Sequence, residues 1–235
     1  MTGSRADVCA VACADLFRDD GEILASPMGL LPSLGARLAR LTFAPDLLLS
    51  DGEATLVAAD GVAEGWLPYR AVFDLLAHGR RHVVMGANQL DRHGNQNISC
   101  IGPHAKPKRQ LLGFRGAPGN TVNHRTSYWV PRHSVRVFVS KVDVVSGVGY
   151  DRSAGPYHDL HRVVTNLAVL DFGGPLRTMR LVSVHPGVAV SDVVSETGFP
   201  LEVNGVTVTR KPTAAELGLL CSLDPDRRRE AEVPS

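Results

Sequence analysis

The residue types best suited to chemistry gather in a polar stretch, residues 85–131, in the middle of this 235-residue chain. Within it, the run 113–120 carries three glycines at intervals of three. Glycines permit positive φ and close backbone approach, and asparagine bonds both ligands and main chain. The backbone around Gly116, Gly119 and Asn120 is therefore a candidate for binding an anion or a developing oxyanion. The alternative is a set of ordinary turns.

Two cationic candidates follow this run. Arg125 can hold a carboxylate through two parallel hydrogen bonds, and His124 stands beside it. A surface or subunit-interface salt bridge is the alternative for Arg125, and packing is the alternative for His124. Tyr128 and Trp129 would suit an apolar slot, although aromatic residues beside a proline are more often part of a core.

Cysteines and histidines do not predict a metal or redox site. The four cysteines include no Cys-x-x-Cys pair, and Cys9 and Cys13 share one face of an expected helix, where thiols pack as small apolar groups. Two histidine pairs stand three or four residues apart, but zinc requires further ligands on a firm scaffold. We expect no bound metal.

Charge and hydropathy exclude several classes of protein. The chain has 25 Lys+Arg against 24 Asp+Glu, a net charge of +1, and is 44% hydrophobic. This balance argues against nucleic-acid binding, which needs a basic surplus. There is no uncharged apolar run of about 18 residues and no signal-peptide layout near the start. We expect a cytoplasmic protein that does not engage membranes.

Periodicity predicts alternating helices and strands, which is typical of an α/β fold. Helices are expected at 8–17, 30–41, 69–78, 190–197 and 213–223. Strands are expected at 22–26, 46–50, 82–85, 136–140, 142–145, 161–172 and 177–185. The last two should form an antiparallel hairpin at one edge of the sheet, around a Gly-Gly-Pro turn. We expect a single domain over residues 1–223 and a frayed tail over 224–235.

The motif at residues 86–97, Gly-Ala-Asn-Gln-Leu-Asp-Arg-His-Gly-Asn-Gln-Asn, resembles that of class I coenzyme A transferase β subunits of the glutaconate type. Further similar segments extend the resemblance over residues 22–224. It implies an open, mainly parallel sheet with flanking helices, paired with a homologous α subunit as α2β2. It also implies an active site between the subunits and no cofactor, because coenzyme A is part of the substrate.

Transferases of this type use a β-subunit glutamate that follows the strand expected at 46–50. Here Asp51 stands near that place and Glu53 comes two residues later. One missing methylene displaces a carboxylate by more than an ångström, which covalent catalysis tolerates poorly. Asp51 and Glu53 are therefore candidates only under the alternative of a transferase acting on a dicarboxylic or keto acid.

Residues 109–151 more closely resemble β subunits of the transferase-like hydrolases that open the last steroid ring in bacterial cholesterol catabolism. This resemblance implies carbon–carbon bond hydrolysis in a cyclic acyl-coenzyme A, with the main carboxylate on the α partner. Water addition creates an alkoxide and its collapse expels an enolate, so fixed N–H or cationic donors are needed. A non-catalytic ligand-binding subunit is the remaining alternative.

Overall fold

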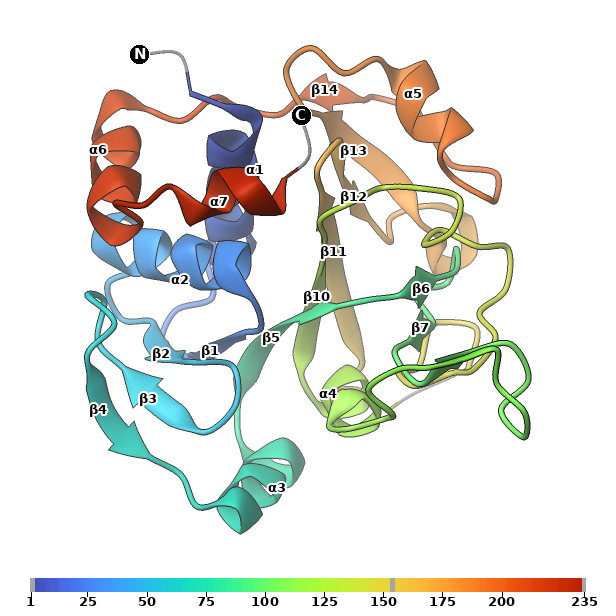
Figure 1. The fold of residues 1–235 in the computed structure, drawn as a ribbon, viewed down its shortest axis with the longest axis horizontal. Helices are drawn as coiled ribbons and strands as arrows, with labels where there is room; N and C mark the ends of the chain where they lie inside the picture. The colour runs from blue at the N-terminus through green and yellow to red at the C-terminus, as the bar shows by residue number, and fades with distance from the viewer. Residues whose placement is uncertain (1–2, 153–154, 234–235) are drawn as a thin grey trace.

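The computed structural model describes residues 3–152 and 155–233 (Figure 1). Its main sheet has ten strands in the order β14-β13-β12-β11-β10-β5-β1-β2-β3-β4. The bounds are β1 (Leu24–Pro27), β2 (Leu48–Ser50), β3 (Thr55–Val57), β4 (Ala63–Trp66), β5 (Arg81–Gly86), β10 (Arg125–Val130), β11 (Asp159–Thr165), β12 (Ala168–Asp171), β13 (Arg180–Val184) and β14 (Thr207–Val208). Two small sheets pair β6 (Gln89–Leu90) with β7 (Gln96–Asn97) and β8 (Cys100–Ile101) with β9 (Arg109–Gln110).

The centre of the sheet is parallel and its flanks are mixed. Strands β2, β1, β5, β10 and β11 run parallel, whereas β12 is antiparallel to both β11 and β13. The expected antiparallel hairpin near the C-terminus is confirmed as β12–β13. At the opposite edge, β3 and β4 form a second antiparallel extension that periodicity did not predict.

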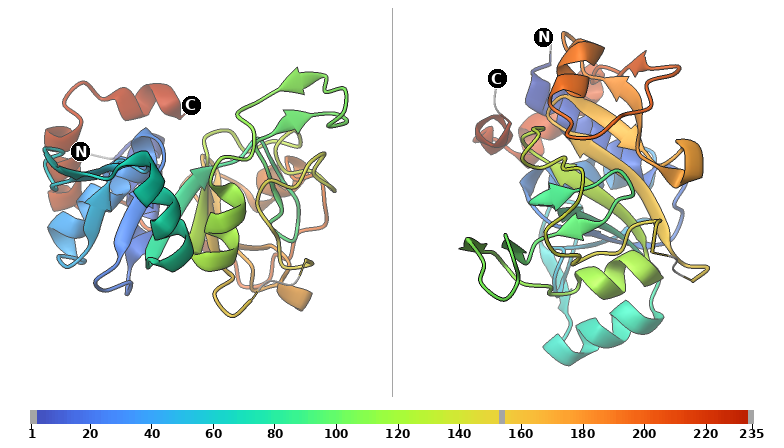
Figure 2. Two further views of the ribbon diagram at one scale, coloured as in Figure 1. Left: turned by 90° about the horizontal axis from the view of Figure 1, so that it is seen from below. Right: turned by 90° about the vertical axis from the view of Figure 1, so that its right-hand side faces the viewer.

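Helices cover both faces of this sheet. They are α1 (Arg5–Ala14), α2 (Leu30–Thr42), α3 (Tyr69–His78), α4 (Ala117–Asn123), α5 (Val190–Ser195), α6 (Ala214–Leu223) and α7 (Arg228–Glu232). Figure 1 shows α1, α2, α6 and α7 gathered together, and Figure 2 shows α3 beside α4. Successive residues of a strand point to opposite faces of the sheet. Val84 and Trp129 therefore pack in the core with α1 and α2, and Val83 and Tyr128 pack in the core with α4.

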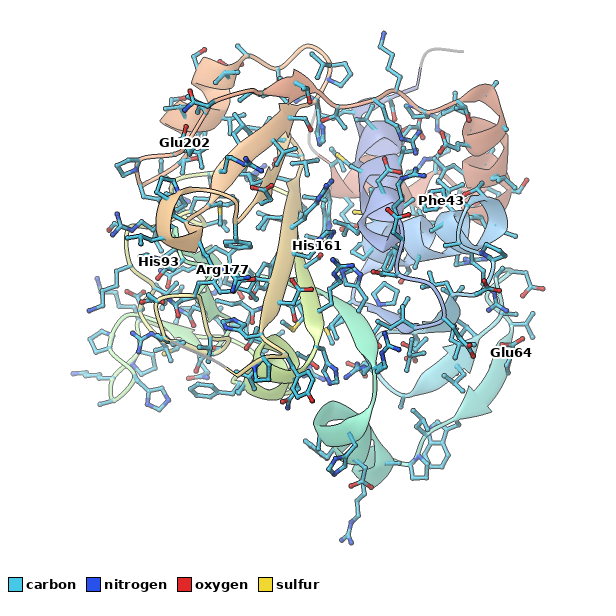
Figure 3. The ribbon with its side chains drawn as sticks, turned by 180° about the vertical axis from the view of Figure 1, so that it is seen from behind. Phe43, Glu64, His93, His161, Arg177 and Glu202 are labelled. Carbon is cyan, nitrogen blue, oxygen red and sulfur yellow. The ribbon has the colours of Figure 1, made fainter. Side chains whose placement is uncertain are left out.

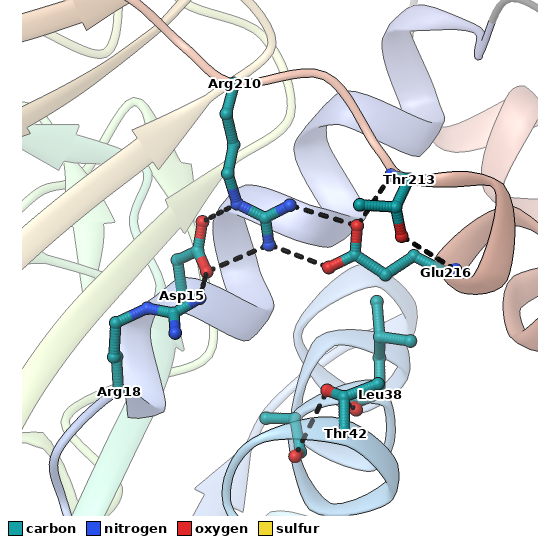
Figure 4. Close-up of polar contacts among 8 residues, drawn as sticks. Asp15, Arg18, Leu38, Thr42, Arg210, Thr213 and Glu216 are labelled. Carbon is teal, nitrogen blue, oxygen red and sulfur yellow. Dashed lines mark hydrogen bonds and ion pairs between the residues drawn. The ribbon is translucent and has the colours of Figure 1, made fainter.

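The α1–α2 contact depends on small residues. Cys9 and Cys13 are fully buried, as the packing interpretation predicts, and a Cβ at Gly35 would lie 2.6 Å from the Cβ of Cys13. Helix α6 begins at the expected cap, since the Thr213 side chain accepts a hydrogen bond from the Glu216 N–H. Glu216 also pairs with Arg210, whose guanidinium binds Asp15 at 2.7 Å (Figure 4). This network ties α6 to the end of α1.

Three expectations for the elements are wrong. Residues 136–140 and 142–145 form no strand, because Phe138 enters the core from irregular backbone with a single isolated bridge to Leu90. The run 161–172 is two strands, β11 and β12, joined by a turn at Asn166 and Leu167. Central strand β10 was missed because its first three residues are polar.

The expectation of a frayed tail is also wrong over residues 224–233. Helix α7 packs against α1, and Arg229 is buried between Asp7 at 2.7 Å and Asp224 at 3.0 Å. Glu232 accepts a hydrogen bond from the Trp129 indole at 2.6 Å. The sequence does not predict this packing because Asp7 and Trp129 are 222 and 103 residues from their partners in the tail. Throughout the described residues, no helix is long and apolar enough to cross a membrane.

Candidate functional site

The sequence candidates lie at opposite edges of the parallel sheet. Asp51 and Glu53 follow the carboxyl end of β2, and Arg115, directly before α4, binds Glu53 at 3.1 Å. Helix α4 then runs back, so that His124 and Arg125 lie at the amino end of β10. Seven helical residues span roughly 10 Å, so Gly116 and Arg125 do not form one site. Ligands in open α/β sheets bind outside the carboxyl ends of the strands, which makes that edge the candidate active site.

Asp51 has a structural task at this edge. Its Oδ1 accepts hydrogen bonds from the backbone N–H groups of Glu53, Ala54 and Thr55 at 2.8, 2.9 and 3.1 Å. Burial acts to raise the pKa of Asp51, but these hydrogen bonds outweigh it and hold the pKa below its ordinary value. A carboxylate that closes a turn in this way is a poor nucleophile.

Glu53 lies at the exposed tip of the same turn. Its side chain is 69% exposed and that of Arg115 is 55% exposed, so their ion pair is a weak surface contact. It nevertheless places a guanidinium beside the carboxyl edge, directly before α4. Nothing in the sequence around Arg115 marks this residue as a candidate, because its link to Glu53 joins positions 62 residues apart.

The glycine run is partly helical. Gly116 is the N-cap of α4, Gly119 lies in the first turn, and the Asn120 N–H donates to the Gly116 carbonyl at 2.9 Å. The expected oxyanion role is therefore wrong for the Asn120 backbone, whose N–H is committed to the helix. Roles for Gly116 and Gly119 stay predictions. The Asn120 side chain instead accepts a hydrogen bond from buried Arg81 at 3.2 Å.

A cavity of about 870 Å³ opens at the amino edge, where β1, β5, β10 and β11 begin. Arg125 is among its lining residues, but its guanidinium binds Asp20 at 2.7 Å and Asp159 at 3.1 Å. The salt-bridge alternative for Arg125 is therefore the one that the structure supports, although the bridge lies within this chain. His124 is 3% exposed, which fits its packing alternative.

Asp20 also begins a buried chain that sequence reasoning missed. Its Oδ2 lies 2.6 Å from Nδ1 of His82, whose Nε2 lies 2.9 Å from the Ser127 hydroxyl. The order matches a hydrolytic triad, but His82 and Ser127 are fully buried and no substrate can reach them. His161, seen on β11 in Figure 3, stacks edge-on to His82. Burial acts to raise the pKa of Asp20, but hydrogen bonds from His82 and Arg125 keep it below its ordinary value.

The family-like motif at 86–97 builds the scaffold around the carboxyl edge. The Asn95 amide donates to Asp91 at 2.9 Å, and the Gln96 amide donates to the Gly86 carbonyl at 2.6 Å, where β5 ends. Burial raises the pKa of Asp91 despite the hydrogen bonds from Asn95. Tyr128 and Trp129 are buried, so they belong to the core and line no slot in this chain. The contacts of Asn95 and Gln96 therefore position the backbone around the end of β5.

Known proteins resemble this chain in sequence and in structure. A family model described as coenzyme A transferase matches residues 71–196. The chain is 57% identical to the IpdB subunit of the cholesterol ring-cleaving hydrolase of Rhodococcus jostii, covering 98% of this chain and 96% of that protein. The corresponding Mycobacterium tuberculosis subunit is 55% identical, with 99% of each chain covered. The crystal structure of Rhodococcus jostii IpdAB matches with a TM-score of 0.94 at 55% identity over 100% of both chains.

The chain therefore belongs to the coenzyme A transferase family, and its fold is the mainly parallel α/β sheet with flanking helices that the family resemblance implies.

Proposed function

We propose that this chain is one subunit of a heteromeric hydrolase that opens the last ring of a steroid-derived acyl-coenzyme A by hydrolysing a carbon–carbon bond. The observation that carries the proposal is the near full-length identity of 57% with a cholesterol ring-cleaving hydrolase subunit. The geometry of Asp51 supports it, because the carboxylate near the transferase position is held by three backbone N–H groups.

The carboxyl edge is half of a site. It offers the backbone at Gly116 and Gly119 and the guanidinium of Arg115, but its two carboxylates are engaged in a turn and a surface ion pair. Leu112 and Phe114, immediately before α4, are 68% and 39% exposed, which is typical of apolar surface that another subunit covers. The homologous α subunit, in an α2β2 assembly, would supply the missing carboxylate.

The proposed reaction balances with water alone. Water adds to a ring carbonyl, the resulting alkoxide collapses, and the carbon–carbon bond breaks to leave a carboxylic acid and an enolate that takes up a proton. Both anions need donors that are fixed before the reaction begins. Arg115 and the start of α4 are placed for that task, and no cofactor is required because coenzyme A belongs to the substrate. The four cysteines are free thiols, which fits the cytoplasm as the proposed compartment.

Reconstitution with the α partner tests the proposal. We expect the chain alone to be inactive and the mixed pair to consume the cyclic steroid acyl-coenzyme A, followed by chromatography of the thioester. Failure of the pair to consume it would refute the proposal. If the pair is instead a transferase, borohydride or hydroxylamine will trap an enzyme-bound thioester, and Asp51→Asn or Glu53→Gln will abolish activity. If the chain binds ligand but takes no part in catalysis, Gly116→Pro should leave turnover unchanged.

A further inference from the structure

Arg81 is a buried cation without a carboxylate partner among the described residues. It begins β5 and is 3% exposed, and its two hydrogen bonds go to neutral acceptors. Arg229 shows the usual arrangement, since it is equally buried but is bound by Asp7 and Asp224. Burial lowers the pKa of Arg81 to about 10, so the guanidinium still carries its charge at neutral pH. Leaving this charge unneutralised costs stability.

The contacts of Arg81 lead to the carboxyl edge. Its Nε donates to the Ser26 hydroxyl at 3.0 Å, and the Ser26 and Ser50 hydroxyls lie 3.3 Å apart. The Ser50 hydroxyl in turn accepts the Gly52 N–H at 3.2 Å, at the centre of the turn that holds Asp51 and Glu53. The guanidinium is therefore linked through two hydroxyls to the turn at the candidate active site.

The second contact of Arg81 leads to the other segment of that site. Its Nη1 donates to the side-chain oxygen of Asn120 at 3.2 Å, one turn into α4. One guanidinium thus bridges the turn at 50–53 and the helix whose first residues face the same edge. An aspartate at position 120 would have the same shape and would neutralise the charge, but the chain has the neutral amide there.

We propose that Arg81 is a positioning residue whose uncompensated charge, acting through Ser26, Ser50 and Asn120, favours the anion that forms at the carboxyl edge. This inference rests on the proposed hydrolase function. A charge in a poorly solvated interior acts over a longer distance than one in water. The alkoxide and enolate carry negative charge that the reacting ketone lacks, so the charge lowers the barrier more than it strengthens substrate binding.

The variant Asn120→Asp in the assembled complex tests the inference, because it gives Arg81 a counter-charge without changing shape. We expect a higher thermal midpoint and a kcat that falls about tenfold, equivalent to about 1.4 kcal/mol, with KM little changed. Asn204→Asp, the same change at an exposed turn, is the matched control and should leave kcat unchanged. A purely structural role for Arg81 predicts that stability rises while kcat stays the same.

Arg81→Lys and Arg81→Gln separate charge from shape. Lysine keeps the charge but lacks the fork that reaches both acceptors, so it should retain more of kcat than glutamine. Equal losses in the two variants, an unchanged kcat in Asn120→Asp, or a loss of kcat with a lower midpoint would each overturn the inference. Absence of turnover by the wild-type pair would instead remove the proposed function, and this inference with it.

Discussion

Charged side chains are paired differently at the amino and carboxyl edges of the parallel sheet. At the amino edge, Asp20 pairs with Arg125 at 2.7 Å and contacts the His82 ring at 2.6 Å. Arg81, which begins β5 and also lines the cavity there, reaches from the amino end of the strand to the neutral Ser26 and Asn120. At the carboxyl edge, the Glu53–Arg115 pair is open to solvent. Fully paired charges hold a fold together, whereas an unpaired one supplies potential to a reaction. The cavity lined by Asp20 and Arg125 therefore lies at the edge where the charges are paired, away from the candidate active site.

Asp20→Ala should produce the largest effect. It removes the carboxylate from His82 Nδ1 and one of the two carboxylates from Arg125, so we expect the free energy of unfolding to fall by about 3 kcal/mol. Urea denaturation of the purified chain measures this loss. Asp226→Ala, the same change at an exposed turn, is the matched control and should cost little. Similar losses in the two variants would mean that the buried network does not support the fold.

Sequence reasoning succeeded where periodicity or a local cap decides the structure. Helix α6 with its Thr213 cap, and the β12–β13 hairpin, follow from neighbouring residues. Strand β10 was missed because buried Thr126 and Ser127 break the apolar alternation that identifies strands. The Ser127 hydroxyl is bound by His82, 45 residues away in the chain.

The site was harder to predict than the fold because its contacts join distant positions. Arg81 and Asn120 are 39 residues apart, and Asp20 and Arg125 are 105 apart. Gly116 and Arg125 are both candidates for binding an anion on the sequence alone, but α4 carries them to opposite edges. Arg229 and Asp7, 222 residues apart, show why the charged tail read as exposed.

His161 should make the free energy of unfolding depend on pH. Burial, together with the nearby charge of Arg125, lowers its folded pKa to about 3, whereas the unfolded ring titrates near 6.5. The unfolded state therefore binds a proton that the folded state does not bind. The contribution of neutral His161 to the free energy of unfolding is complete above pH 6.5 and declines as the pH falls toward 3. The free energy of unfolding falls by up to about 1.4 kcal/mol for each pH unit in this range.

Urea midpoints between pH 7 and pH 4 measure this slope in wild type and in His161→Gln. The variant should have a shallower decline, by close to the amount that one proton contributes. His104, an exposed histidine, gives the control His104→Gln, which should keep the wild-type slope. If His161→Gln leaves the slope unchanged, His161 is protonated in the folded chain. The amino edge would then hold this positive charge in addition to that of Arg125.

Glu53→Gln should have the smallest effect on stability. It compares the loss of a carboxylate at the carboxyl edge with the loss of Asp20 at the amino edge. The Glu53–Arg115 pair is mostly exposed, so its loss should cost less than about 1 kcal/mol, against about 3 kcal/mol for Asp20→Ala. Turnover by the assembled hydrolase should persist, because removing the carboxylate frees Arg115 to face the anion and takes away no nucleophile. Steady-state kinetics of the pair check this outcome. A loss of several orders of magnitude in kcat would make Glu53 the nucleophile, and the carboxyl edge would then be a transferase site that supplies its own carboxylate.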